Sequence, residues 1–127
     1  MFNFKIIFKK TSKWVSFFYY MYMGYVYLIE DIYNNTYKIG VAKDVNKRIK
    51  SLQTGNVGSL KLIWEFKTDY PYKLEGMLHR TLQEYHERGE WFGLPDYIIK
   101  DFPNICERIN NIIISLKDNP YFAKNLK

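Results

Sequence analysis

The chain has 127 residues, of which 47% are hydrophobic and 25% are charged. This length suits one globular domain with a single core, and no apolar run reaches the roughly 18 residues of a membrane helix, so we expect no membrane association. Lysine and arginine outnumber aspartate and glutamate by 19 to 13, a net charge of +6. This balance favours a polyanionic partner such as DNA.

The one cysteine, Cys106, excludes an internal disulfide and favours a reducing environment, so we expect an intracellular protein, cytoplasmic or nuclear. Its apolar-periodic surroundings predict a buried thiol rather than a reactive one. Residues 1–22 make a poor signal peptide, because their short apolar part is rich in tyrosine and precedes no small-residue cleavage site. They fit an added strand, a basic arm or an upstream extension of the domain; we favour an extension with partial strand character.

The first predicted elements form a β-hairpin. Residues 25–31 are β-branched and aromatic with a loose alternation, which is typical of a strand, and 36–42 have the pattern of the returning strand. Asn34 and Asn35 supply the turn between them.

A short helix is expected directly after the hairpin. Asp44 is a good N-cap for a helix over 45–53, and its apolar side chains recur at i, i+4 and i+7, which gives one buried face. Gly55 ends this helix.

A third strand and a second helix come next. Alternation over 59–68 predicts a strand with one apolar face. The members of that face are Leu60, Leu62, Trp64 and Phe66. The second helix is expected to start near Pro71 and to run to about residue 87, with Gly89 as its stop.

The remaining chain has weaker patterns. Residues 90–93 fit a short strand or turn, Pro95 fits the start of a short helical piece, and Pro103 fits the start of a last, isoleucine-rich helix. The segment from Asn119 is expected to fray. Strands and helices therefore mix without a regular βαβ alternation, which is the α+β class.

Several polar side chains lie at the borders of the predicted apolar faces. Arg48 lies roughly 60° to one side of the apolar face of the first helix. Glu75 has a similar place on the second helix, and His79 follows it by one turn. Each of these also fits an ordinary solvated surface, and without cysteine or a denser cluster we expect no zinc site. A strand tyrosine such as Tyr27 usually only packs its ring and satisfies its hydroxyl.

Together, a tyrosine, a lysine, an arginine and a glutamate at the border of one core are the groups needed to cut a phosphodiester. A carboxylate can hold Mg²⁺ through one or two oxygens. The metal and an arginine neutralise the charge that builds on the phosphoryl oxygens. A phenol with a lowered pKa, or a water that it polarises, can take a proton from the attacking water.

These residues resemble the GIY-YIG endonuclease superfamily. The tripeptide "YVY" at 25–27 stands in the place of the first motif, and "KIG" at 38–40 in the place of the second. Arg48 follows at the spacing of the helix arginine, and Glu75, in "LEGMLHRTLQEYHERGEWF", resembles the metal-binding glutamate. The likeness covers about residues 24–93 and is greatest to the short-form phage, viral and fungal branch.

The resemblance implies a role for each matching residue. Tyr27 would be the general base, Arg48 would contact the scissile phosphate, and Glu75 would hold the single Mg²⁺ or Mn²⁺ ion. Gly40 would let the backbone turn tightly where a side chain would crowd the site. Lys38 replaces the second tyrosine and would hold the phosphate or lower the pKa of Tyr27 by its charge.

The resemblance also adds Tyr25 and His79 as further candidates for the site. It implies a small α+β fold with a three-stranded, mainly antiparallel sheet flanked by helices. The expected organisation is an N-terminal extension over 1–22, the nuclease-like domain over 23–93, a helical extension packed on it over 94–118, and a tail over 119–127.

The leading hypothesis is a Mg²⁺-dependent endonuclease that hydrolyses DNA by a one-metal, tyrosine-assisted reaction. The alternative is a DNA-binding module that keeps the fold and does not cut. Glu75 favours the enzyme, because a carboxylate beside phosphate would only repel it in a pure binding site. A third hypothesis is an interaction domain that binds no nucleic acid. The sequence indicates no oligomeric state.

Overall fold

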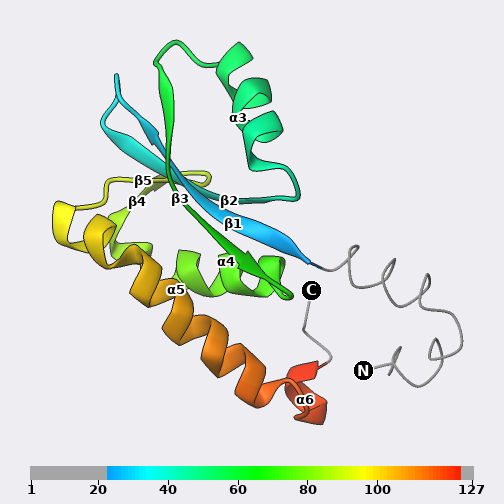
Figure 1. Cartoon of the computed structure of the whole chain (residues 1–127). Coiled ribbons are helices and arrows are strands. Elements are labelled where there is room, and N and C mark those ends of the chain that lie inside the picture. The colour runs from blue at the N-terminus through cyan, green and yellow to red at the C-terminus, as the bar shows by residue number, and fades with distance from the viewer. Residues whose placement is uncertain (1–22, 124–127) are drawn as a thin grey trace, which may run out of the picture.

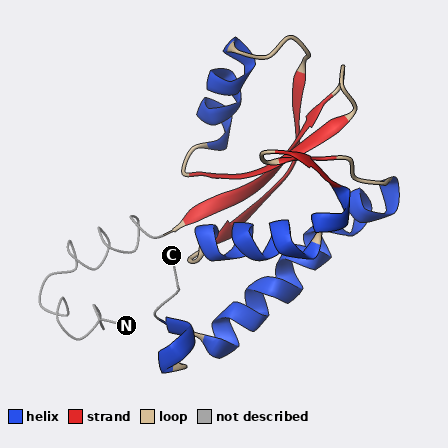
Figure 2. Ribbon diagram, turned by 180° about the vertical axis from the view of Figure 1, so that it is seen from behind, coloured by secondary structure: helices blue, strands red, loops and turns tan. Residues whose placement is uncertain are grey.

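The computed structural model describes residues 23–123. They form a five-stranded antiparallel sheet with strand order β3-β1-β2-β5-β4. Helix α3 lies against one face of the sheet, and α4 and α5 lie against the other (Figures 1 and 2). The expected extension over 1–22 and the last four residues of the expected tail lie outside the described residues.

The expected hairpin is present. Strands β1 (Gly24–Asp31) and β2 (Thr36–Ala42) are antiparallel, and their register places Tyr27 opposite Gly40. Asn35 takes the turn position with a φ of 54°, a left-handed conformation that asparagine tolerates better than most residues.

Helix α3 (Val45–Thr54) begins and ends close to the expected positions. The Asp44 side chain accepts a hydrogen bond from the backbone N–H of Lys47 at 3.0 Å, which satisfies one of the free donors at the helix start. Val45 is buried with Tyr27 and Ile29 in the smaller of the two core clusters. The helix is thereby fixed over the middle of β1.

Strand β3 (Leu60–Thr68) is present, but the expectation of one continuous apolar face is wrong. Its pairing with β1 shifts between Leu28 and Ile29, and such an irregularity moves the following side chains to the other face. Leu62 therefore packs on the α3 side, whereas Phe66 packs on the α4 and α5 side.

The expected three-stranded sheet is wrong, because two short strands extend it to five. Helix α4 (Pro71–Thr81) ends six residues earlier than expected and is followed by the 3₁₀ turn η1 (Gln83–Tyr85). Strands β4 (His86–Arg88) and β5 (Trp91–Phe92) then form a hairpin on β2. Strands of three and two residues are too short for an alternation signal, and pairing with β2 decides their conformation.

The last helices also differ from the expectation. Helix α5 (Asp96–Leu116) is one continuous helix that contains Pro103, so this proline does not start it. Only one backbone donor is lost at Pro103, and the buried residues around it hold the helix on the core. A short helix, α6 (Pro120–Ala123), follows, and the expected boundary between residues 93 and 94 stays a prediction.

The larger core cluster lies between the sheet and helices α4 and α5. Its fully buried members include Leu28, Ile39, Leu78 and Phe92. Cys106 is also buried there, as expected, and burial raises the pKa of its thiol to about 12, so the thiol is neutral and unreactive near neutral pH. Over residues 23–123, no helix combines the length and the apolar character needed to cross a bilayer.

Candidate active site

Tyr27 and Gly40 form the floor of the site, on the α3 side of the sheet. They face each other across β1 and β2, and a Cβ atom added at Gly40 would overlap the hydroxyl and ring of Tyr27. Gly40 therefore makes room for the phenol. It does not form the tight turn expected from the sequence, because it lies inside β2 and its φ is not positive.

Arg48 reaches this floor from the first turns of α3. The residue is exposed, and its guanidinium is close enough to Tyr27 to act on the phenol through a hydrogen bond and through its charge. The N-cap at Asp44 fixes where the helix begins and so fixes the place of Arg48 over β1.

The pKa of Tyr27 is raised rather than lowered. Burial of the phenol is the largest cause, and the negative charges of Glu90 and Glu75 add to it. Arg48 acts in the opposite direction and offsets only part of the rise. The net direction is upward, and the expected lowering contribution of Lys38 to this pKa stays a prediction. A phenol with a pKa above about 10 is neutral near pH 7.

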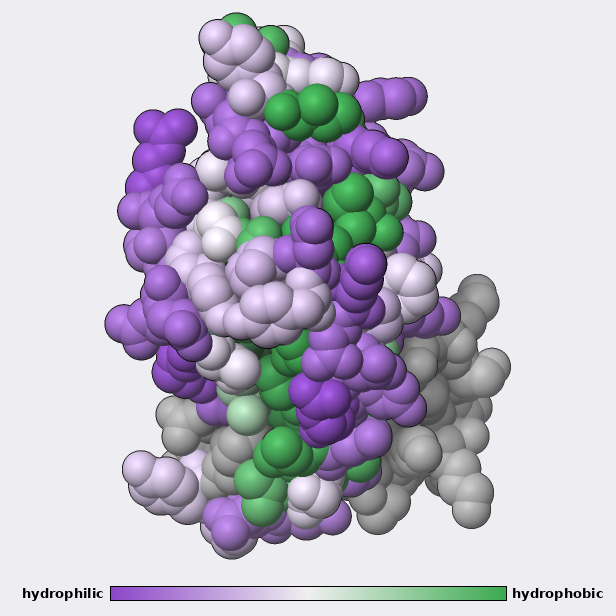
Figure 3. Space-filling view, turned by 90° about the vertical axis from the view of Figure 1, so that its left-hand side faces the viewer, coloured by the Kyte–Doolittle hydropathy of each residue, from purple (hydrophilic) through white to green (hydrophobic). Residues whose placement is uncertain are grey.

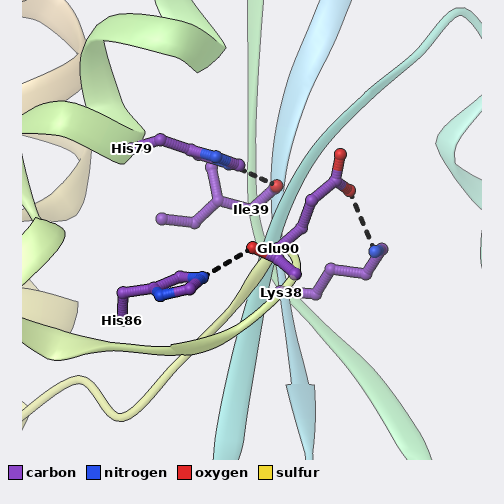
Figure 4. Close-up of polar contacts among 6 residues, drawn as sticks. Lys38, Ile39, His79, His86 and Glu90 are labelled. Atoms are coloured by element: carbon purple, nitrogen blue, oxygen red, sulfur yellow. Dashed lines mark hydrogen bonds and ion pairs between the residues drawn. The ribbon is translucent and has the colours of Figure 1, made fainter.

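Lys38 enters the site from β2 and is held by two neighbours. Its ammonium lies 2.9 Å from Oε1 of Glu90 and 5.5 Å from the ring centroid of Trp91. Only 9% of Lys38 is exposed, whereas the Glu90 side chain is 42% exposed, so the ammonium is shielded from solvent and the carboxylate is only partly so (Figure 4 shows the pair). Such burial is favourable only where a charged partner is close.

Glu75 is carried by the second turn of α4 and is partly buried. Burial raises the pKa of its carboxyl, and the charge of Glu90 raises it further, whereas His79 and Lys38 lower it. These mutual effects place Glu75 within the electrostatic range of Tyr27, Lys38 and Glu90.

His79 joins α4 to the sheet. Its Nε2–H donates to the carbonyl oxygen of Ile39 at 3.0 Å (Figure 4). Its ring also makes a T-shaped contact with the ring of Phe92, with a centroid distance of 5.1 Å. This bond satisfies a β2 carbonyl beside the short strand β5. The placement gives His79 a structural task that keeps Glu75 close to β2.

Of the residues singled out from the sequence, the structure brings five together: Tyr27, Lys38, Gly40, Arg48 and Glu75. Tyr25 instead packs partly buried against the α3-side core. Among residues 23–123 there is no group of three or more metal-ligating side chains of the His, Cys, Asp and Glu types. The oxygen donors of the site are the carboxylates of Glu75 and Glu90.

Glu90 is the member that sequence reasoning missed. Residues 90–93 fit a short strand or turn, and no local pattern indicates that this turn lies beside Lys38. The pairing of Lys38 with Trp91 across β2 and β5 brings Glu90 to the ammonium. The one signal for Glu90 is its position directly before the β5 strand. Using it requires the register in which β5 pairs with β2, and a two-residue strand has no pattern that predicts a register.

Comparisons with known proteins place the chain differently from the expected superfamily. The family model of the T5orf172 domain matches residues 24–110, and the expected GIY-YIG assignment is wrong, since the matching family is a distinct one. T5orf172 domains are a nuclease-like and DNA-binding-like family. The match covers more than half of the chain and extends into α5.

A relative of unknown activity supports the match. "Uncharacterized protein 460R" of Invertebrate iridescent virus 6 is 32% identical over 104 residues, which cover 78% of this chain and 46% of that protein. The chain thus spans about half the length of this viral relative. No solved structure matches the chain significantly.

Proposed function

Because the chain belongs to the T5orf172 domain family, we propose that it is a divalent-cation-dependent endonuclease that hydrolyses DNA. The observation that carries the proposal is the meeting of Arg48, Lys38 and Glu75 around the floor of Tyr27 and Gly40. Two cations and a partly buried carboxylate beside one phenol match the needs of phosphodiester hydrolysis.

The two cations would bind the scissile phosphate. Arg48 is exposed and its guanidinium lies close enough to Tyr27 to act on the phenol, so its N–H donors are available to a phosphate at the site. A guanidinium suits the paired oxygens of a phosphate. Lys38 would add a second positive charge to the oxygens on which negative charge builds in the transition state.

Tyr27 would act in its neutral form. Its raised pKa makes a free phenolate scarce near pH 7, so the hydroxyl would orient Arg48 by a hydrogen bond rather than start the reaction as a base. This retains a tyrosine-assisted reaction and changes the tyrosine's part in it.

A divalent cation fits the donors of the site. Both Glu75 and Glu90 offer carboxylate oxygens, and the raised pKa of Glu75 reflects a negative charge that the free protein stabilises poorly. Mg²⁺ is usually held by one or two carboxylates together with water and substrate phosphate, so a cage of three protein ligands is not required. Mg²⁺ or Mn²⁺ held there would supply charge neutralisation and a more acidic bound water.

A DNA-binding module that does not cut is the second candidate. The observations that favour it are the burial of Tyr27, which is 1% exposed, and the neutralisation of Lys38 by Glu90. In that case Arg48 and the neighbouring lysines would contact phosphates without hydrolysis.

The test is the nicking of supercoiled plasmid by the full chain with Mg²⁺ or Mn²⁺. The variant Glu75→Gln removes the carboxylate at nearly constant volume, and we expect it to lower the nicking rate by about a hundredfold or more. Glu107→Gln, an exposed glutamate on α5, is the matched control and should leave the rate unchanged.

Three results separate the hypotheses. Metal-dependent nicking that is lost in Glu75→Gln supports the enzyme. Plasmid binding in a gel-shift assay without nicking, with either metal, would instead assign the chain to the binding module. A chain that neither binds nor nicks DNA would contradict both.

A further inference from the structure

We infer that Glu90 is a positioning residue that holds the Lys38 ammonium in place for the phosphate and away from Glu75. The inference rests on the proposed function and gives Glu90, so far only a possible oxygen donor to the cation, a more specific task. It follows from the contacts of Lys38, from the turn that carries Glu90, and from the influence of the Lys38 charge on a second carboxylate, Glu75.

Lys38 has a long, flexible side chain whose direction must be set by its neighbours. Its side chain is 11% exposed, and the ammonium lies 2.9 Å from Glu90 Oε1. The Trp91 ring adds a cation–π contact at 5.5 Å. A lysine ammonium is a point charge on a rotatable stem, so these two contacts define where the charge is presented.

Two hydrogen bonds and a glycine conformation define the turn that carries Glu90. The backbone N–H of Ile39 donates to the Glu90 carbonyl at 3.1 Å, and Nε2–H of His86 donates to the Gly89 carbonyl at 2.8 Å. Gly89 itself has a φ of 54°, which favours glycine. Figure 4 shows His86 and Glu90 on this turn, with the Glu90 carboxylate directed toward Lys38. The carboxylate therefore starts from a well-defined backbone.

Lys38 has a second carboxylate within its electrostatic range. Its charge acts on Glu75, and Glu75 and Glu90 act on each other. Without the Glu90 charge, Glu75 remains as a carboxylate on which the Lys38 charge acts. The ammonium would then turn toward the group proposed to hold the divalent cation and compete with that cation there.

Competition between the Lys38 ammonium and Mg²⁺ at Glu75 should make the effect of removing Glu90 depend on the Mg²⁺ concentration. In Glu90→Gln we expect nicking to fall by about ten- to a hundredfold at a fixed Mg²⁺ concentration, which is the scale of effect that a misplaced group produces. Raising the Mg²⁺ concentration should recover part of the loss. Metal-free DNA binding should be kept or become tighter, because a negative charge has left the phosphate site.

The test is a double-mutant cycle of Glu90→Gln and Lys38→Met. The cycle measures how far the effect of one substitution on nicking depends on the presence of the other residue. In the Lys38→Met background, Glu90→Gln should change nicking by less than about twofold, since the lysine that it positions is gone. Glu87→Gln is the matched control, an exposed glutamate in the same β4–β5 hairpin, and should change neither nicking nor DNA binding.

Other outcomes overturn the inference and leave the proposed function standing. Glu90→Gln could lower nicking by the same factor with and without Lys38, which would make Glu90 an independent ligand or base. It could also lower the urea midpoint and DNA binding together with nicking, which would make the ion pair purely structural. A wild-type chain that does not nick would contradict the proposed function itself, and is recognised before any variant is compared.

Discussion

Gly40 decides how closely β2 can approach the phenol of Tyr27. The two residues are opposite each other, and the ring is 1% exposed, so no open space is left into which it could move. A glycine at this place is required by a neighbouring side chain rather than by a special backbone conformation.

The first prediction follows from this contact. In Gly40→Ala the added methyl group overlaps the Tyr27 ring, so we expect the free energy of unfolding to fall by about 1–3 kcal/mol, as in other overpacked cores. The measurement is urea denaturation. Gly55→Ala is the control, because an added Cβ there meets nothing within 4 Å; equal effects of the two substitutions would contradict the explanation.

The second prediction concerns Glu75, where a substitution should raise the free energy of unfolding rather than lower it. Its folded pKa is raised, mainly by burial, so above that pKa the ionised carboxylate is less favourable in the folded protein than in the unfolded chain. Glu75→Gln should therefore stabilise the metal-free protein near pH 7, by less than about 1 kcal/mol because solvent screens a partly exposed group.

The check for this prediction is a pair of thermal melts at pH 7, with and without Mg²⁺. Mg²⁺ should raise the melting temperature of the wild type, because a ligand that binds only the folded state stabilises it, and should have no effect on Glu75→Gln. A variant that is less stable than the wild type without metal would show that Glu75 has a structural task.

The sequence predicts which residues form the candidate site better than it predicts their protonation states. Arg48 and Glu75 were singled out because helical periodicity places them at the borders of apolar faces, and the structure brings both to Tyr27. The direction of the Tyr27 pKa depends on how deeply the ring is buried and on the charges around it. Those quantities come from tertiary packing, so neither they nor the part of Glu90 followed from local patterns.

At the scale of elements, the correct expectations are those with a strong local signal. Strands β1 and β2 alternate and flank an asparagine turn, and α3 has a side-chain N-cap. The expected bounds fail where a distant partner decides the conformation. Strand β5 forms because it pairs with β2, and α5 continues through Pro103 because both sides of that proline are anchored in the core.

Two loops at one end of the sheet are joined by a buried carboxylate. Asp31 is 2% exposed and accepts hydrogen bonds from the backbone and side chain of Asn34 in the hairpin turn, at 3.1 and 2.8 Å. It also accepts one from Asn56 at 3.0 Å, from the loop after α3. Burial alone would raise the pKa of Asp31, but these hydrogen bonds outweigh it and hold the pKa below its ordinary value.

The third prediction concerns this connection. Asp31→Asn replaces an acceptor by an amide that also carries donors, so we expect it to lower the free energy of unfolding by about 1–3 kcal/mol at pH 7. The lowered pKa fixes the pH dependence. The stabilisation by the carboxylate is fully present above the ordinary aspartate pKa, about 4, and is lost as the pH falls through the lower folded value.

Urea midpoints measured from pH 7 down to about pH 2 would check this prediction. The difference between wild type and Asp31→Asn should be constant near neutrality and should close in the acid range. Asp69→Asn, at an exposed aspartate after β3, is the control. A difference that is the same at every pH would show that the charge of Asp31 is not the cause.

At the scale of the whole molecule, Tyr27, Arg48 and the basic residues beside them lie on the α3 side of the sheet, whereas Glu75 comes from α4 on the other face. Lys43 and Lys47 are exposed at the junction of β2 and α3, next to the helix turn that carries Arg48. Helix α5 lies on the opposite face (Figure 1). Seen from the side, the surface is mostly hydrophilic, with apolar patches between (Figure 3). A polyanion bound at the site would meet the α3 side first.

The fourth prediction separates local contacts from net charge. DNA binding by a chain of charge +6 should weaken steeply with salt, with a slope of log K against log salt of roughly −0.9 for each phosphate contact. Replacing Lys43 and Lys47 by glutamine should reduce the magnitude of that slope by up to about 2. Replacing Lys100 and Lys117, which are exposed on or next to α5, removes the same charge and should leave the slope unchanged.

The comparison decides which surface binds, because both double variants have the same net charge. If DNA lies across α3, only the first pair alters the number of counterions released, and the second pair acts at most through a field that falls off within about 10 Å at 0.1 M salt. Equal changes in slope would mean that binding follows net charge alone. A larger change for the α5 pair would move the DNA to the opposite face, away from Arg48 and α3, and would separate binding from the α3 side of the candidate active site.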